Sequence, residues 1–189
     1  MMRNIGTVAV IGAGALGGMY AAAFADMDPE SVVLVAGGRR KERLESEGFR
    51  FNDRSYRLPV AEPQGPARPT GLILVAVKHR QLEQTLDDMA RFVGPESLII
   101  SVMNGIESEE RIAARFGWER TLYCVALGMD SLRENNRIRC SNLGRLLVGA
   151  AHNQAPDDRV QRVRALLDQA GIECEVPEDM IRALWWKYM

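Results

Sequence analysis

The chain has 189 residues, 47% of them hydrophobic and 26% charged, which is enough to bury one sizeable core, or one domain and the start of another. The 24 basic and 25 acidic residues give a formal net charge of -1 without a long basic block, which argues against a nucleic-acid surface. Three widely spaced cysteines, Cys124, Cys140 and Cys174, and only two histidines argue against a metal site. We expect reduced thiols in a cytoplasmic protein.

The N-terminal segment TVAVIGAGALGGMYAAAFAD, Thr7 to Asp26, allows two interpretations. Its apolar middle resembles a secretory signal or a membrane span, and Gly14-x-x-x-Gly18 imitates a membrane dimer motif. However, Gly12, Gly14 and Gly17 form G-A-G-A-L-G between an apolar run and a stretch of helix formers, the strand, turn and helix of a dinucleotide fold. There the glycines permit a tight turn, the approach of a pyrophosphate and close helix packing, while the helix N-terminus attracts the phosphates. We therefore favour a dinucleotide-binding domain over export.

The rest of the chain alternates apolar strand patterns with helical ones. We expect strands at 31–36, 72–77, 97–102, 121–127, 137–140 and 145–148, helices at 39–47, 81–92, 108–116 and 158–170, and a surface hairpin at 49–59. Continuously apolar strands are typical of a parallel sheet buried on both faces. The sequence therefore predicts an α/β, Rossmann-like, doubly wound and mostly parallel sheet, complete by about residue 148, in a dinucleotide-binding domain at 1–176.

The residues after the second expected strand indicate which dinucleotide is bound. An NAD site usually has an acidic residue there, whereas this chain has Ala36-Gly37-Gly38 followed by Arg39, Arg40 and Lys41. Most basic runs of this kind are solvated surface. Here they start a helix, where cations oppose the helix dipole, so a bound 2′-phosphate would relieve the arrangement. We favour NADP over NAD as the cofactor.

Two polar residues follow strands at their carboxyl ends, where open parallel sheets bind ligands. Lys78 ends LILVAVK, and Asn104 ends LIISVMN and precedes Gly105. Both are expected to point into the crevice where nicotinamide and substrate meet. The alternatives are a solvated lysine and a turn-forming Asn-Gly pair, which for these two residues alone are equally good explanations.

The C-terminal segment VPEDMIRALWWKYM predicts a helix that begins with Pro177, Glu178 and Asp179. At helical spacing one apolar face collects Met180, Ile181, Leu184, Trp185 and Tyr188. Lys187 falls at the edge of this face. Such a lysine is usually a snorkelling side chain, but partial burial would also lower its pKa, which suits a proton donor.

Five segments together resemble the N-terminal domain of the ketopantoate reductase (2-dehydropantoate 2-reductase) family: VAVIGAGALGG, LVAVKHRQLEQTL, LIISVMNGIESEERIAARFG, GRLLVGA and ALWWKYM. That family uses NADPH to reduce ketopantoate to pantoate, the precursor of pantothenate and coenzyme A. The resemblance implies that Lys78 and Asn104 line the cofactor and substrate site and that Lys187 is the catalytic lysine, with Asn104 assisting. It also implies which residues form the pyrophosphate turn: Gly12, Ala13, Gly14, Ala15, Leu16 and Gly17.

The chain departs from the family in three places. Met103 stands where the family commonly has Gln, and Arg39 or Arg40 would have to replace an arginine common near Gly37. The family also continues into an all-helical domain, and residues 177–189 would be only the start of the helix that leads to it. We therefore expect the chain alone to bind NADPH, to turn over little substrate, and to have either a frayed C-terminal helix or a homodimer formed through this exposed helix.

Two other functions remain open at this stage. A related dehydrogenase could act on another 2-oxo acid or an opine-type substrate, and a non-catalytic module could sense NADP. A sensor needs no lysine at the edge of an apolar helix face, which argues against the second. In each case we expect a cytoplasmic protein that binds a small molecule and neither nucleic acid nor a membrane.

Overall fold

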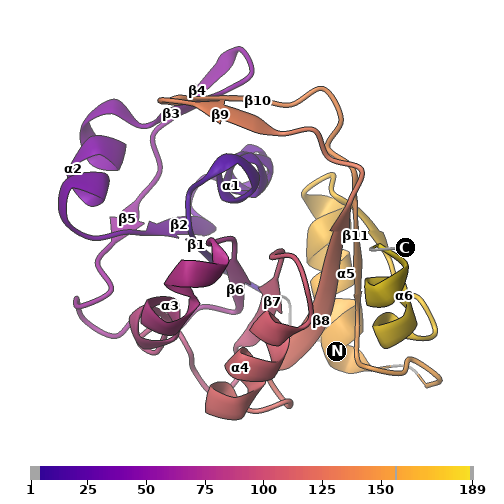
Figure 1. Cartoon of the computed structure of the whole chain (residues 1–189). Helices are drawn as coiled ribbons and strands as arrows, with labels where there is room; N and C mark the ends of the chain where they lie inside the picture. Colours follow the sequence, from indigo (N-terminus) through magenta and orange to yellow (C-terminus); the bar gives the residue numbers. More distant parts are fainter. Residues whose placement is uncertain (1–4, 156, 188–189) are drawn as a thin grey trace.

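The computed structural model of the chain describes residues 5–155 and 157–187. Its centre is an eight-stranded sheet in the order β12-β11-β8-β7-β6-β1-β2-β5 (Figure 1). The strands are β1 (Val8–Ile11), β2 (Val32–Val35), β5 (Val60–Ala61), β6 (Leu72–Val75), β7 (Leu98–Ser101), β8 (Thr121–Leu127), β11 (Arg145–Gly149) and β12 (Glu173–Glu175). The strands from β5 to β8 pair in parallel, and β11 runs antiparallel to β8. The expected doubly wound, mostly parallel sheet is confirmed.

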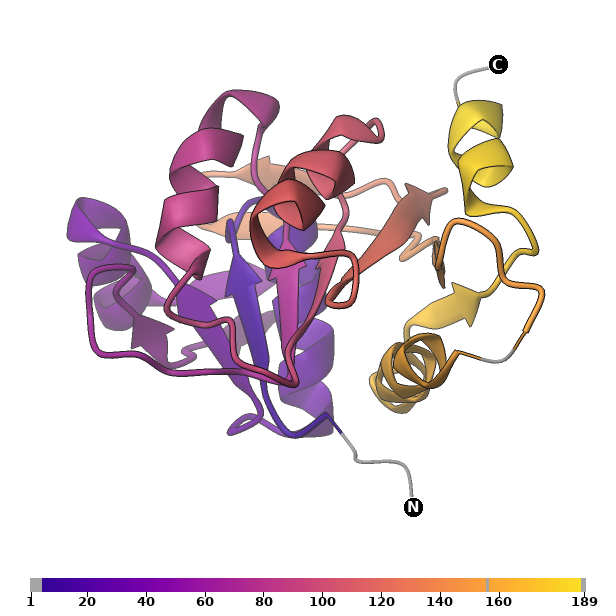
Figure 2. The same cartoon turned by 90° about the horizontal axis from the view of Figure 1, so that it is seen from below.

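Helices cover both faces of this sheet, as its continuously apolar strands require. They are α1 (Ala15–Met27), α2 (Gly38–Glu47), α3 (Leu82–Met89), α4 (Glu107–Phe116), α5 (Asp158–Gln169) and α6 (Met180–Trp186), with a short 3-10 turn η1 (His79–Gln81) before α3. Buried residues of α1, α2 and α5 share one core cluster, while those of α3, α4 and α6 pack on the opposite face. Figure 2 shows α3 and α4 in front of the central strands and α6 beside the far edge.

A second, four-stranded sheet in the order β4-β3-β10-β9 lies over α1 (Figure 1). Its strands are β3 (Phe49–Phe51), β4 (Arg54–Tyr56), β9 (Leu132–Glu134) and β10 (Arg137–Arg139). The expected hairpin at 49–59 is present as β3 and β4. The expected strand at 137–140 is also present, but it pairs with β3 and β9 instead of extending the main sheet.

The second sheet explains why α1 is apolar on every side. A helix that is hydrophobic all round is buried all round, and α1 contacts β1 and β2 on one side and β3 and β10 on the other. A Cβ atom added at Gly18 would lie 2.2 Å from Ile138 Cδ1 of β10. The segment that resembled an export signal is therefore an interior helix. Among the described residues, no helix is long and apolar enough to cross a bilayer.

The C-terminal part differs from expectation in three ways. The sheet is not complete at residue 148, because β12 pairs with β11 at its edge. Helix α6 begins at Met180 instead of Pro177, because the Asp179 carboxylate caps it by accepting from the Arg182 N–H at 2.9 Å. Met180 and Leu184 are buried as expected, but Trp185 is 59% exposed. Tyr188, the last residue expected on that face, lies outside the described residues.

Candidate active site

The turn between β1 and α1 has the sterics of a dinucleotide-binding loop. Gly12 has φ +97°, and a Cβ there would lie 2.6 Å from the Ala76 carbonyl oxygen of the neighbouring strand segment. A Cβ on Gly17 would lie 2.1 Å from the Gly12 carbonyl oxygen, so α1 packs too closely for any side chain. At Gly14 the nearest atom would be 3.9 Å away. The first and third glycines are thus required by packing, and the second faces open space.

The N-terminus of α1 is built to receive an anion. Gly14 is its N-cap residue and has no side chain to accept from the first turn, which also carries no acidic residue. The first N–H groups of a helix have no intrahelical partner, and here they belong to Ala15, Leu16 and Gly17. Ala13 is buried beneath the turn. These residues fit a pyrophosphate.

The start of α2 carries the two arginines that were expected to select the cofactor. Arg39 and Arg40 lie exposed in the first turn, which again has no acidic residue, and neither forms an ion pair among the described residues. Lys41 is engaged differently, because its ammonium lies 3.1 Å from Glu62. Partial loss of solvent and the nearby Arg43 lower the pKa of Arg40. A bound anion would offset the repulsion between Arg40 and Arg43.

The structure brings Asn104 and Lys187 together. Lys187 Nζ, just after α6, donates to Asn104 Oδ1, in the turn after β7, at 2.8 Å. Gly105 has φ +92°, as an Asn-Gly turn requires. Asn104 and Lys187 line one cavity of about 440 Å³, which reaches Leu16 of the glycine turn. Its lining is Leu16, Val102, Asn104, Ala126, Leu127, Gly128, Met129, Ser131 and Lys187.

Lys187 titrates below its ordinary range. Burial lowers the pKa of its ammonium, while Cys124 and Glu109 oppose the shift. A lysine with a lowered pKa gives up a proton more readily than a solvated one. The partly buried position anticipated from the helical pattern is therefore present, with a hydrogen-bond partner that the pattern did not reveal.

Glu109 is a residue of this site that sequence reasoning missed. Its side chain is wholly buried, and its carboxylate accepts from Ser108 Oγ at 2.6 Å and from the Cys124 N–H at 3.3 Å. Burial raises the pKa of Glu109 to about 7, against these hydrogen bonds. The charged Glu107 and Glu110, close to it in the chain, give this segment the look of a solvated face. The available signal was its spacing of three and four residues from the buried Ile112 and Ala113.

A chain of hydroxyl groups connects Glu109 to the turn that carries Asn104. Ser108 Oγ lies 2.8 Å from Ser101 Oγ, which accepts from the Met103 N–H at 3.3 Å. Met103 immediately precedes Asn104. The buried carboxylate thus fixes the backbone behind the Asn104 amide.

Arg133 of β9 is a second residue that was missed. Its Nη1 donates to the carbonyl oxygens of Ala13 and Gly14, at the glycine turn itself. The contact depends on the second sheet, whose pairing joins segments far apart in the chain.

Lys78 does not join the Asn104–Lys187 pair. It is exposed at the start of η1, and its backbone N–H donates to Gln81 Oε1 at 3.4 Å. Within residues 5–155 and 157–187, no hydrogen bond or ion pair links it to Asn104 or Lys187. Its role in cofactor or substrate binding stays a prediction.

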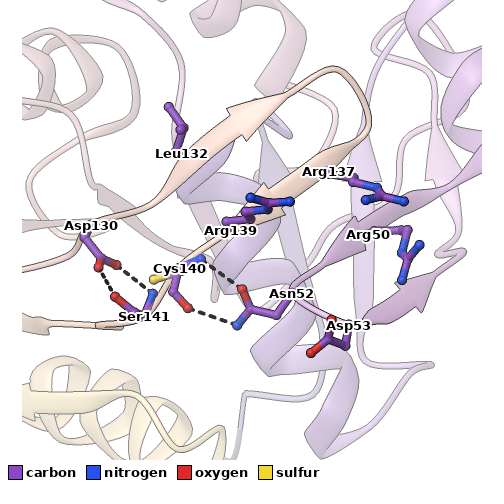
Figure 3. Close-up of a pocket in the computed structure, with 9 residues that line it drawn as sticks. All are labelled: Arg50, Asn52, Asp53, Asp130, Leu132, Arg137, Arg139, Cys140 and Ser141. Carbon is purple, nitrogen blue, oxygen red and sulfur yellow. Dashed lines mark hydrogen bonds between the residues drawn. The ribbon is translucent and has the colours of Figure 1, made fainter.

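A separate concavity of about 580 Å³ lies on the outer face of the second sheet (Figure 3). Arg50, Arg137 and Arg139 point into it, and paired hydrogen bonds between Asn52 and Cys140 support its floor. It shares no lining residue with the Asn104–Lys187 cavity and includes no part of the glycine turn. We therefore place the candidate active site at the carboxyl ends of the parallel strands. In the described part of the chain, no group of three or more His, Cys, Asp and Glu side chains could hold a metal ion.

Comparisons with known proteins concern the family and the fold of the chain. The family described as Ketopantoate reductase PanE/ApbA matches residues 8–153. An uncharacterised oxidoreductase of Bacillus subtilis is 25% identical over 186 residues, which cover 95% of this chain and 60% of the relative. A 2-dehydropantoate 2-reductase of Pyrococcus horikoshii is 25% identical over 181 residues, which cover 94% of this chain and 58% of the relative.

Solved structures share the fold. The 2-dehydropantoate 2-reductase of Geobacter metallireducens matches with a TM-score of 0.81 and 28% identity, over 96% of this chain and 61% of its own. D-mandelate dehydrogenase, solved with NADH and anilino(oxo)acetate, matches with a TM-score of 0.83 and 18% identity over 96% of this chain and 60% of its own, a likeness of fold alone. The chain spans about 60% of the length of the curated relatives it matches. By the match over residues 8–153, the chain belongs to the ketopantoate reductase PanE/ApbA family.

Proposed function

We propose that this chain provides the cofactor site and the catalytic lysine of an NADPH-dependent reductase of 2-oxo acids. The observation that carries the proposal is the 2.8 Å hydrogen bond between Lys187 Nζ and Asn104 Oδ1, in a cavity that reaches the glycine turn. Because the relatives share at most 28% identity with this chain, the proposal concerns 2-oxo acids as a class. Ketopantoate, on the route to pantothenate and coenzyme A, is the substrate to test first.

The chain's own residues would hold the cofactor in two places. The turn from Gly12 to Gly17 would receive the pyrophosphate, and Arg39 and Arg40 would receive the 2′-phosphate that distinguishes NADPH from NADH. The absence of an acid at Ala36-Gly37-Gly38 supports this preference. When bound, NADPH supplies the hydride for the ketone carbon.

Lys187 would polarise the ketone oxygen of the substrate and then protonate it. A cation directed at this oxygen stabilises negative charge that develops only in the transition state. The lowered pKa of Lys187 favours release of its proton at the end of the step. Asn104 would orient the ammonium, since its amide oxygen accepts one of the three N–H bonds and leaves two for the substrate.

Titration with the two cofactors tests the proposal. NADPH should bind the chain more tightly than NADH, and the double variant Arg39→Ala, Arg40→Ala should erase most of the difference. The loss should be on the order of 1.5 to 3 kcal/mol, as for a charge-assisted hydrogen bond. Arg139→Ala, which removes an exposed arginine from the second sheet, is the matched control. Equal affinities of the wild type for NADPH and NADH would contradict the NADP assignment.

Assays with several 2-oxo acids test the reaction itself. We expect the 189-residue chain to bind NADPH but to turn over little ketopantoate, because Lys187 directly follows two exposed side chains, Trp185 and Trp186. Catalysis needs a substrate fixed against the hydride donor in a site closed to water. Full-rate turnover by a monomer of this chain would contradict this account of the site.

A further inference from the structure

Arg133 faces the cofactor turn because of its register in the second sheet. It stands opposite Ile138 in the antiparallel pair of β9 and β10, and Ile138 packs inward against Gly18 of α1. Side chains alternate along a strand, so Arg137 and Arg139 point outward into the concavity of Figure 3. One hairpin thus carries an inward arginine and two outward ones.

The contacts of Arg133 leave part of its guanidinium unused. Nε donates to the Asn135 carbonyl at 3.0 Å, and Nη1 donates to the carbonyl oxygens of Ala13 and Gly14. Nη2 is buried and has no hydrogen-bond partner. A buried donor without an acceptor is unfavourable, and an arginine forms its strongest hydrogen bonds with phosphate or carboxylate oxygens.

The surroundings of Arg133 are positively charged. The side chain forms no ion pair with the described acidic residues. Burial and the charges of Arg40 and Arg43 lower the pKa of Arg133, so the three arginines lie within electrostatic range of one another. The positive end of α1 adds to this charge, since its first turn has no acidic residue. The unpaired Nη2 donor, the N-terminus of α1 and the nearby arginines all favour a bound anion.

We propose that Arg133, from the second sheet, binds the pyrophosphate of the dinucleotide together with the N–H groups at the start of α1. Arg133 is partly exposed, so a small turn of its guanidinium presents Nη2 to the ligand. The inference rests on the proposed cofactor use and assigns different parts of the cofactor to different arginines. Because both cofactors contain the pyrophosphate, Arg133 contributes to the affinity for NADPH and NADH alike, whereas Arg39 and Arg40 distinguish them.

Calorimetric titration of variants tests this assignment. Arg133→Gln keeps a donor for the Ala13 carbonyl but removes the charge, and Arg133→Lys keeps the charge. We expect Arg133→Gln to weaken NADPH and NADH by a similar factor, about 10-fold or more, and Arg133→Lys to weaken them less. Arg137→Gln, on the outer face of the same hairpin, should leave both affinities unchanged. Inorganic pyrophosphate should compete with NADH for the wild type more strongly than for Arg133→Gln.

Salt dependence separates anion binding from a purely structural role at the turn. The fall of NADH affinity with rising salt should be shallower for Arg133→Gln and unchanged for Arg133→Lys, since one ion pair is lost in the first only. Wild-type affinity of Arg133→Gln for both cofactors would overturn the assignment, and so would a loss restricted to NADPH, which would point to the 2′-phosphate. If the wild type bound neither cofactor, the proposed function would fail as well.

Discussion

The candidate site has two halves, the glycine turn and the Asn104–Lys187 pair, and they differ in whether backbone or side chains form them. The cofactor turn consists of backbone, and its shape is enforced at Gly12 and Gly17, where a Cβ would collide with carbonyl oxygens. The proposed catalytic half is a single hydrogen bond between the exposed Asn104 and the partly buried Lys187, which follows the seven-residue helix α6. The proposed cofactor binding would therefore rest on backbone that is fixed by packing, whereas the proposed catalysis would depend on two side chains that a short helix and a turn must hold in place.

The largest expected effect lies in the catalytic half. In any preparation that reduces a 2-oxo acid, Lys187→Ala should lower turnover by roughly 100-fold or more and leave NADPH affinity nearly unchanged. Turnover of the wild type should also fall as pH rises through the lowered pKa of Lys187, since a proton donor acts in its protonated form. Arg182→Ala, an exposed change on the same helix, is the control. Normal turnover of Lys187→Ala would make this lysine a snorkelling side chain.

In the glycine turn, two substitutions should separate fold stability from cofactor binding. Gly17→Ala should destabilise the fold by about 3 kcal/mol, because its Cβ would meet the Gly12 carbonyl oxygen at 2.1 Å. Gly14→Ala meets nothing closer than 3.9 Å, so the free energy of unfolding should barely change while the approach of a pyrophosphate is hindered. Denaturant melts and NADPH titrations on both variants measure the two effects. Equal destabilisation by the two substitutions would contradict the steric account.

Glu109 supports the turn that carries Asn104, and its protonation affects the stability of the fold. Its pKa is about 7 in the folded chain and 4.5 when solvated, so between these pH values only the folded state holds the proton. Stability contributed by this group is complete below pH 4.5 and is lost as pH rises to about 7, a change of at most about 3 kcal/mol. Glu109→Gln should flatten the dependence of the unfolding free energy on pH between 4.5 and 7. The same change at the exposed Glu110 should leave that dependence unchanged. An unchanged slope in Glu109→Gln would contradict the assignment.

The main sheet was predictable because its signals are local. Val32–Val35 and Leu72–Val75 are apolar runs whose meaning needs no distant partner, and the glycine spacing identifies the turn. Strand ends and helical spacing singled out Asn104 and Lys187, and the family resemblance gave them their predicted roles; both line one cavity.

The missed residues depend on contacts that no local pattern encodes. Arg133 reaches Ala13 only because the three-residue strand β9 joins a sheet built from segments far apart in the chain. Glu109 stands in the acidic run Glu107-Ser108-Glu109-Glu110, where charge masked its place on the buried face of α4. The predicted preference for NADPH differs from these two residues, because a local pattern of the sequence suggests it. Only a titration can test it.

The smallest expected effect concerns the exposed end of α6. Trp185 and Trp186 are 59% and 62% exposed, and exposed aromatic surface favours self-association. Two tryptophans bury on the order of 150–250 Å² each, well below the roughly 1,200 Å² of a stable interface, so a homodimer formed through them should be weak. Sedimentation should detect it only at high protein concentration, and Trp185→Ser with Trp186→Ser should abolish it. Trp118→Ser removes another exposed tryptophan, one that is 45% exposed, and should not abolish the dimer. Because the double variant leaves the glycine turn intact, its affinity for NADPH should equal that of the wild type. A loss of NADPH binding together with the dimer would show that the two halves of the site are not separable.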